Sequence, residues 1–184
     1  MKKLTFPVKN KSELKSLAAG DSVLVSGTIY TARDAAHKKL HGLIKENKPL
    51  PIELENQAIY YTGPCPKPEN RPIGSCGPTT ASRMDAYAPE LLDSGLAAMI
   101  AKGDRNEDVK RSIKNNGAVY LAAAGGAGAL MADSVKKCEL VAFGELLSEA
   151  IYRLEVENMP LTVVIDADGN DLYVLGRKKY EEKQ

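Results

Sequence analysis

The stretch SVLVSGTIYTARDAAHKKLHGLIKEN, residues 22–47, decides the fold class because its side-chain pattern changes part-way along. Residues 22–31 are rich in β-branched side chains, which predicts a buried strand. Residues 32–47 are helix formers, and Pro49 and Pro51 follow them. Their apolar members recur near the helical period: Ala36, Leu40, Leu43 and Ile44. The stretch therefore predicts a strand that leads directly into a helix.

The same alternation continues along the chain. Strands are predicted within QAIYYTGPCP (57–66), LAAMIAKG (96–103), the start of AVYLAAAGGAGALMA (118–132), CELVAF (138–143) and LTVVIDADG (161–169). Helices are predicted within TTASRMDAYAPELLDSG (79–95), NEDVKRSIKNNG (106–117), with Asn106 as N-cap, and ELLSEAIYRLEVENM (145–159). Short connections between alternating strands and helices indicate a layered α/β fold with much parallel pairing. The length of 184 residues predicts one domain over residues 1–184.

Composition narrows the classes of partner. Hydrophobic residues make up 43% and charged residues 27% of the chain, which is typical of a globular protein. With 25 Lys+Arg against 24 Asp+Glu, the chain lacks the overall field that nucleic acid or an anionic membrane would require. The start, MKKLTFPVKN, has only a short apolar patch, and no apolar run approaches the roughly 20 residues of a membrane span. We expect no nucleic acid, no membrane and a cytoplasmic location.

The cysteines and histidines favour a structural interpretation. Three cysteines without CxxC spacing argue against a disulfide framework and against a self-contained zinc or iron–sulfur site: Cys65, Cys76 and Cys138. His37 and His41 in HKKLH would share one helix face, but Lys38 stands where a zinc protease needs its glutamate. We expect no metal there and a partly exposed helix surface.

Two short stretches could carry chemistry. In GSCGPTTASRMDAYAP (74–89), a helix that begins at Gly77-Pro78-Thr79-Thr80 would offer free N–H groups to an anion, with Arg83 on the face of Thr79 at i,i+4. A hydroxyl and an arginine fork at a helix N-terminus suit a carboxylate or a phosphate. Composition alone slightly favours the alternative, in which Thr79 is an ordinary N-cap and Arg83 a surface ion-pair partner.

The second stretch is the glycine cluster AAAGGAGALMA. It lacks the G-x-G-x-x-G order and the lysine of a phosphate-binding loop. We therefore favour close packing as the use of Gly125, Gly126 and Gly128 over nucleotide binding.

Six stretches in succession resemble a known family. These are GTIYTARDAAH, YYTGPCP, IGSCGPTTASRMD, MIAKGDRN, AVYLAAAGGAGALMA and LTVVIDADGND. In this order and with these gaps, they resemble the beta subunit, or C-terminal domain, of class I fumarate hydratases and L-tartrate dehydratases. The resemblance covers nearly the whole chain and is far more specific than any single motif above.

The resemblance implies a fold, a cofactor and a partner. The family fold is a three-layer swivelling β/β/α domain, with mixed sheets and flanking helices. The family activity is reversible hydration of fumarate to L-malate. A four-iron iron–sulfur cluster would be held by three cysteines of a separate alpha subunit, and none would be bound by this chain alone. We expect a hetero-oligomer with that alpha subunit and a small dicarboxylate as substrate.

The family's functional positions fall on particular residues of this sequence. The arginine of TARDAAH falls on Arg33, which would hold one substrate carboxylate, with His37 supporting it one turn later. The threonine of GPTT-x-x-R falls on Thr79, the implied base, although the sequence leaves Thr80 open as the reacting hydroxyl. Three further positions complete the implied set: Gly77 for substrate binding, Arg83 to bind the other carboxylate or to help position Thr79, and Lys102 as a catalytic cation. A threonine hydroxyl is a poor base at neutral pH, so cations must stabilise its alkoxide.

Two other functions stay open. Tartrate dehydration uses a substrate that differs by one hydroxyl, and its deciding contacts could lie on the alpha subunit. A non-catalytic anion-binding or scaffolding module is the other alternative. The presence of both arginines, the threonine and the lysine argues against the second.

Overall fold

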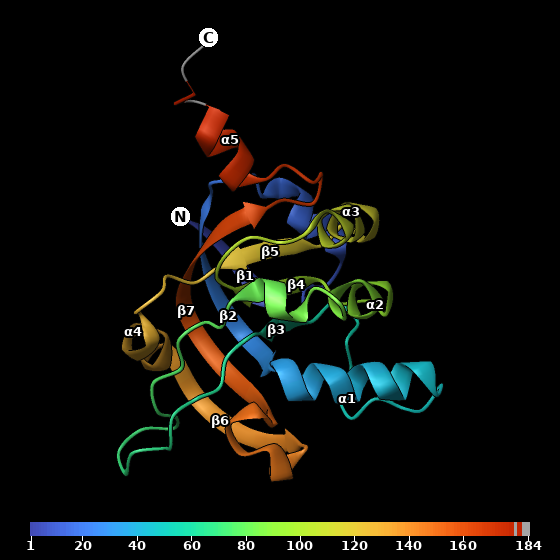
Figure 1. The fold of residues 1–184 in the computed structure, drawn as a ribbon. Coiled ribbons are helices and arrows are strands. Elements are labelled where there is room, and N and C mark those ends of the chain that lie inside the picture. The colour runs from blue at the N-terminus through green and yellow to red at the C-terminus, as the bar shows by residue number, and fades with distance from the viewer. Residues whose placement is uncertain (179, 182–184) are drawn as a thin grey trace.

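The computed structural model of the chain describes residues 1–178, 180 and 181. Within these residues seven strands form one mixed sheet, and helices flank it (Figure 1). The strands are β1 (Lys2–Phe6), β2 (Ser22–Thr31), β3 (Ala58–Tyr60), β4 (Ala98–Ala101), β5 (Val119–Ala122), β6 (Val135–Ala142) and β7 (Ile151–Ile165). The helices are α1 (Asp34–Lys45), α2 (Ala88–Asp93), α3 (Glu107–Asn116), α4 (Gly128–Asp133) and α5 (Leu172–Lys178), with 3₁₀ turns η1 (Lys11–Ser16), η2 (Ala81–Met84) and η3 (Gly144–Glu149). The predicted α/β class with a mixed sheet and flanking helices is confirmed.

The sheet curves until it closes on itself. Strands β2, β3, β4 and β5 are parallel neighbours, and β7 runs antiparallel to both β5 and β2. These pairings join β2-β3-β4-β5-β7 into a closed, barrel-like ring, with β1 on an edge of β2 and β6 on an edge of β7. The parallel core of the sheet was predicted, whereas its closure through β7 was not.

The strand period separates two cores. Ala58 and Tyr60 point into a cluster inside the curved sheet, whereas Ile59 and Tyr61 point outward into a second cluster. Because successive side chains of a strand face opposite sides, each short strand contributes to both clusters. The outer cluster packs against α1, α2 and α3, which lie together on one side of the sheet, whereas α4 lies on the other side (Figure 1).

Several predicted elements are confirmed. The predicted strand 22–31 is β2, and the helix after it is α1. Helix α3 begins after Asn106, whose side chain accepts a hydrogen bond from the Val109 N–H at 2.9 Å, as the predicted N-cap should. No helix among the described residues is both long and apolar enough to cross a membrane.

The predicted helix over 145–159 is wrong. Residues Gly144–Glu149 form the 3₁₀ turn η3, and the chain then continues as the long strand β7. The spacing of Ile151 and Leu154 fits a helix, but β7 hydrogen-bonds to β2, β5 and β6, and these tertiary contacts override the local pattern. Strand β1, at Lys2–Phe6, was not predicted.

Candidate functional site at the ends of the parallel strands

The carboxyl ends of β2, β3, β4 and β5 meet at one edge of the sheet because these strands are parallel neighbours. Arg33 lies two residues after β2, and Lys102 comes directly after β4. Gly125 follows β5, and a Cβ added there would lie 3.8 Å from Cδ of Lys102. Ligands of parallel α/β sheets, both open and closed, bind at the carboxyl ends of the strands. The topology therefore gathers residues that are nearly 100 positions apart in the sequence.

Thr79 lies across this edge, between the ends of β3 and β4. Its backbone N–H donates to the Tyr61 carbonyl at 2.7 Å, and its carbonyl accepts from the Lys102 N–H at 3.2 Å. Pro78 pairs with Thr62 and Thr80 pairs with Lys102 as isolated bridges. The segment is thus held as a short extended piece by the backbones of two strands. It brings Thr79 and Lys102 together, as the candidate site requires.

The predicted helix start at Gly77-Pro78-Thr79-Thr80 is wrong, and the predicted helix within 79–95 is confirmed only in two short pieces, η2 and α2. The chain is extended through Thr80, and the first helical piece, η2, is a 3₁₀ turn of 4 residues that begins at Ala81. Its N-cap is Thr80, whose side chain makes no capping hydrogen bond. Thr79 is therefore neither a helix N-cap nor a neighbour of Arg83 on one helix face. The strand ends explain the difference, because they satisfy the backbone groups of Thr79.

Gly77 lies close to the glycine cluster after β5. The Thr62 hydroxyl donates to the Gly77 carbonyl at 2.8 Å, and the Cys76 N–H donates to the Gly128 carbonyl at 3.1 Å. A Cβ added to Gly128 would lie 2.4 Å from Oγ of Ser75 and 3.0 Å from the Gly77 nitrogen. Close packing is confirmed at Gly128, although the contact is with the loop of residues 75–77, whereas a Cβ added to Gly126 would meet nothing within 4 Å.

Arg33 and Arg83 reach the same carboxylate. Arg83 Nε lies 2.8 Å from Asp34 Oδ1, and Arg33 Nε lies 3.3 Å from Asp34 Oδ2. Arg33 Nη2 also lies 3.5 Å from Glu149 Oε1, and a Cβ on Gly63 would meet Arg33 Nη1 at 2.8 Å. The two predicted carboxylate-binding residues are thus neighbours in space. Nothing in the sequence marked Asp34, Glu149 or Gly63 as part of the site.

His37 lies beneath Arg33 and is fully buried. Its Nδ1 lies 3.1 Å from the Arg33 carbonyl, and its ring packs edge-on against Tyr61 with centroids 4.7 Å apart. Burial lowers the pKa of His37 to about 4, so the imidazole is neutral at pH 7 and Nδ1–H donates to the carbonyl. The predicted support of Arg33 has a physical basis in this contact. The predicted partly exposed surface is wrong for His37, although His41 is half-buried and pairs with Glu90 at 2.6 Å.

A buried ion pair lies under the same edge. Arg105 and Asp85 approach to 2.7 Å between Nε and Oδ1, although the two atoms are not aligned for a linear hydrogen bond. The guanidinium carbon of Arg105 lies 5.5 Å from the ring centroids of both Tyr61 and Tyr120. The pair links the segment after β4 to the chain just after Arg83. It was not predicted, since nothing in the sequence separates Arg105 from an exposed arginine.

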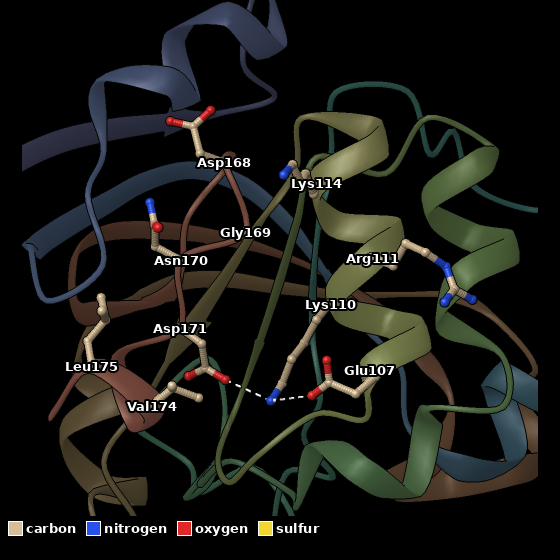
Figure 2. Close-up of a pocket in the computed structure, with 10 residues that line it drawn as sticks. All are labelled: Glu107, Lys110, Arg111, Lys114, Asp168, Gly169, Asn170, Asp171, Val174 and Leu175. Atoms are coloured by element: carbon tan, nitrogen blue, oxygen red, sulfur yellow. Dashed lines mark ion pairs between the residues drawn. The ribbon is translucent and has the colours of Figure 1, made fainter. Parts of the chain in front are cut away.

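A separate pocket of 510 Å³ lies between α3 and residues 168–175 (Figure 2). Lys110 points into it and pairs with Asp171 at 2.8 Å and with Glu107 at 3.2 Å. The pocket lining carries as many acidic as basic side chains, so the pocket offers no excess of positive charge to a dianionic ligand. None of its lining residues belongs to the predicted site.

Comparison with known proteins agrees with this geometry. The profile of the family described as Fumarase C-terminus matches residues 2–176. The chain belongs to this family. The resemblance stated from the sequence is thereby confirmed, and the match includes the four strand ends described above.

The relatives of this chain fall into two groups, one of similar length and one of much longer proteins. A Methanocaldococcus jannaschii protein provisionally named L(+)-tartrate dehydratase subunit beta is 40% identical, over 97% of this chain and 95% of its own length. Fumarate hydratase 2 of Leishmania major is 40% identical over 90% of this chain but only 29% of its own length. The anaerobic class I fumarate hydratase of Escherichia coli is 41% identical over 92% of this chain and 32% of its own. The chain thus spans about a third of the fumarate hydratases that it matches.

Proposed function

We propose that this chain is the beta-type part of a hydro-lyase that hydrates fumarate reversibly to L-malate. The observation that carries the proposal is the grouping of Arg33, Arg83, Thr79 and Lys102 at the carboxyl edge of the parallel strands. Two arginines, a hydroxyl and an ammonium group at one sheet edge match what a small dicarboxylate requires. The names of the relatives support the reaction class.

Each residue of the group would have its own task. Arg33 and Arg83 would each bind one carboxylate of the substrate, since a guanidinium can donate two parallel hydrogen bonds to a carboxylate. Gly77 would let the substrate approach the backbone, and His37 would hold the main chain at Arg33. The cations also reduce the cost of adding negative charge to the substrate as its carbon loses a proton.

Thr79 would be the group that exchanges this proton with the substrate carbon. A hydroxyl can do so only if its conjugate alkoxide is stabilised. Lys102 is next to Thr79 through the backbone hydrogen bond at 3.2 Å, and among the described residues no ion pair neutralises its side chain. Thr79 is half-buried whereas Thr80 is exposed, which favours Thr79 as the reacting hydroxyl.

The cysteines of this chain do not fit an iron–sulfur cluster. Within residues 1–178, 180 and 181, no group of three or more His, Cys, Asp or Glu side chains is placed to hold a metal ion. Burial raises the pKa of the Cys76 thiol to about 12, which adds to the cost of forming the thiolate that a cluster ligand requires. The four-iron cluster implied by the resemblance would therefore take its ligands from the proposed alpha subunit.

Other parts of the prediction remain proposals. They are the alpha subunit as hetero-oligomeric partner, the three-layer swivelling arrangement, a single domain over residues 1–184 and a cytoplasmic location. The partner is supported by the lengths of the relatives. One relative of similar length is named as a subunit, and the fumarate hydratases carry roughly twice as much additional sequence.

Anaerobic co-expression with an alpha-type chain that carries three suitable cysteines tests the proposal. The purified complex should interconvert fumarate and L-malate, and a complex in which Arg33 and Arg83 are both changed to alanine should not. A cluster-replete wild-type complex that leaves fumarate, malate and both tartrates unchanged would instead support a non-catalytic anion-binding module.

Tartrate dehydration is the second candidate function. The relative named as a tartrate dehydratase subunit matches this chain from end to end at 40% identity, as high as the fumarate hydratases. The ratio of kcat/KM for L-tartrate to that for L-malate in the same complex separates the two functions.

A further inference from the structure

The two arginines proposed to bind substrate are connected by one carboxylate. Asp34 Oδ1 lies 2.8 Å from Nε of Arg83, and Asp34 Oδ2 lies 3.3 Å from Nε of Arg33. Each carboxylate oxygen of Asp34 thus contacts one arginine, and each arginine makes its contact through Nε. Residues 49 positions apart are joined in this way.

This arrangement leaves the outer ends of both guanidinium groups available. A guanidinium has five N–H donors, so an Nε bond to Asp34 leaves those of the terminal nitrogens. Arg33 Nη2 makes only a longer contact, 3.5 Å, with Glu149. The side chain of Arg83 is 49% exposed, and the described residues give it no ion-pair partner besides Asp34. The orientation of Arg83 therefore depends on Asp34.

Asp34 is itself held firmly. It is the first residue of α1, and the next N–H of that helix, at Ala35, donates to Glu149 Oε2 at 2.8 Å. Burial alone would raise the pKa of Asp34, but its own backbone N–H and the two arginines outweigh this, so the pKa lies below its ordinary value. Asp34 is thus an anion at neutral pH, at a helix start that is hydrogen-bonded to Glu149.

We propose that Asp34 is a positioning residue that sets the spacing and orientation of Arg33 and Arg83, so that their terminal N–H groups receive the two carboxylates of one substrate molecule. The inference rests on the proposed function. It extends that function by assigning the geometry of dicarboxylate recognition to a residue outside the set of substrate contacts. A competing role is that Asp34 occupies the arginines in place of a substrate carboxylate.

These two roles predict opposite changes in KM. In the assembled complex, Asp34→Asn should raise KM for the dicarboxylate about tenfold or more, because both arginines lose a charge-assisted bond. Turnover at saturation should change less than about threefold, since the reacting groups remain. An unchanged or lower KM overturns the proposal, and a lower KM indicates competition.

Asp108→Asn is the matched control. Asp108 also lies in the first turn of a helix and pairs with an arginine, Arg111 Nη2, at 2.6 Å, but both side chains are 68% exposed and lie outside the site. It should change the helix N-terminus in the same way without changing KM. A similar rise in KM for both variants would assign the effect to helix stability and overturn the proposal.

A second readout does not depend on activity. In ¹H–¹⁵N spectra of the isolated chain, the Nε–H signals of Arg33 and Arg83, assigned from single Arg→Lys variants, should both shift in Asp34→Asn. Asp108→Asn should leave both signals in place. If only one signal or neither responds, Asp34 does not connect the arginines. If both respond while the wild-type complex has no hydratase activity, the proposed function fails and the connection between the arginines stands.

Discussion

Arg105→Met should destabilise the chain strongly, because it leaves a carboxylate buried without its cation. Arg105 is 3% exposed and Asp85 is 8% exposed, and their charged atoms lie 2.7 Å apart. Removal of one partner of a buried pair costs about 3–5 kcal/mol. Asp85 Oδ2 keeps a hydrogen bond of 2.8 Å from the Asn106 N–H, which places the expected cost near 4 kcal/mol, or a fall in Tm of about 8–16 °C.

Urea unfolding followed by circular dichroism at pH 7 measures this free energy, with thermal melts as a second measurement. The double variant Arg105→Met with Asp85→Asn is the control, because asparagine still accepts from Asn106 but carries no charge. It should recover about 2 kcal/mol or more of the loss. The single variant could instead lose less than about 1 kcal/mol in free energy of unfolding, or the double variant could be no more stable than the single one. Either result would show that the buried charge pair does not stabilise this edge of the sheet.

Three further predictions concern the surroundings of the site. Gly63→Ala should raise KM about tenfold or more by displacing Arg33, because the new Cβ would lie 2.8 Å from Arg33 Nη1 and 3.1 Å from the Ser148 carbonyl. Gly42→Ala is the control and should leave KM unchanged, because the space around Gly42 is open. Equal KM values for the two variants would contradict this prediction. His37 is neutral in the folded chain down to about pH 4, but it takes up a proton near pH 6.5 when the chain is unfolded. The free energy of unfolding should therefore fall as the pH falls from 6.5 to 4. In urea titrations, His37→Leu should show a smaller fall in the free energy of unfolding over this pH range. Serine at all three cysteines should leave the iron content of an assembled complex near normal, and a large loss of iron would place the ligands in this chain.

Local sequence patterns predicted the parts of the fold that local forces determine. Strand β2, helix α1 and the cap at Asn106 each follow from side chains within one or two turns. The end of β7 lies within the predicted strand 161–169, but residues 151–159 did not follow, because their strand conformation comes from pairing with the distant strands β2 and β6 rather than from their own helical spacing. The barrel closure depends on long-range pairings of the same kind and has no local signal.

In the candidate site, too, some features could be predicted from the sequence and others depend on long-range contacts. The resemblance to the family identified Arg33, Thr79, Arg83 and Lys102, and the parallel strands bring them to one edge. The local prediction at Thr79 failed because helix-forming residues follow it, whereas its backbone is held by Tyr61 and Lys102. Asp34 follows Arg33 directly, but its contact with Arg83 depends on how α1 packs against η2, which the sequence does not state.

The turnover number of a Thr79→Ala complex shows whether the hydroxyl of Thr79 exchanges the proton. Alanine keeps both backbone hydrogen bonds of residue 79, at 2.7 and 3.2 Å, so assembly, cluster content and Tm should match the wild type. If Thr79 exchanges the proton, kcat on the preferred dicarboxylate should fall by about a hundredfold or more with KM little changed, whereas Thr80→Ala should keep most of its activity. Near-normal turnover of a cluster-replete Thr79→Ala complex on fumarate, malate and both tartrates would show that Thr79 is not the group that exchanges the proton.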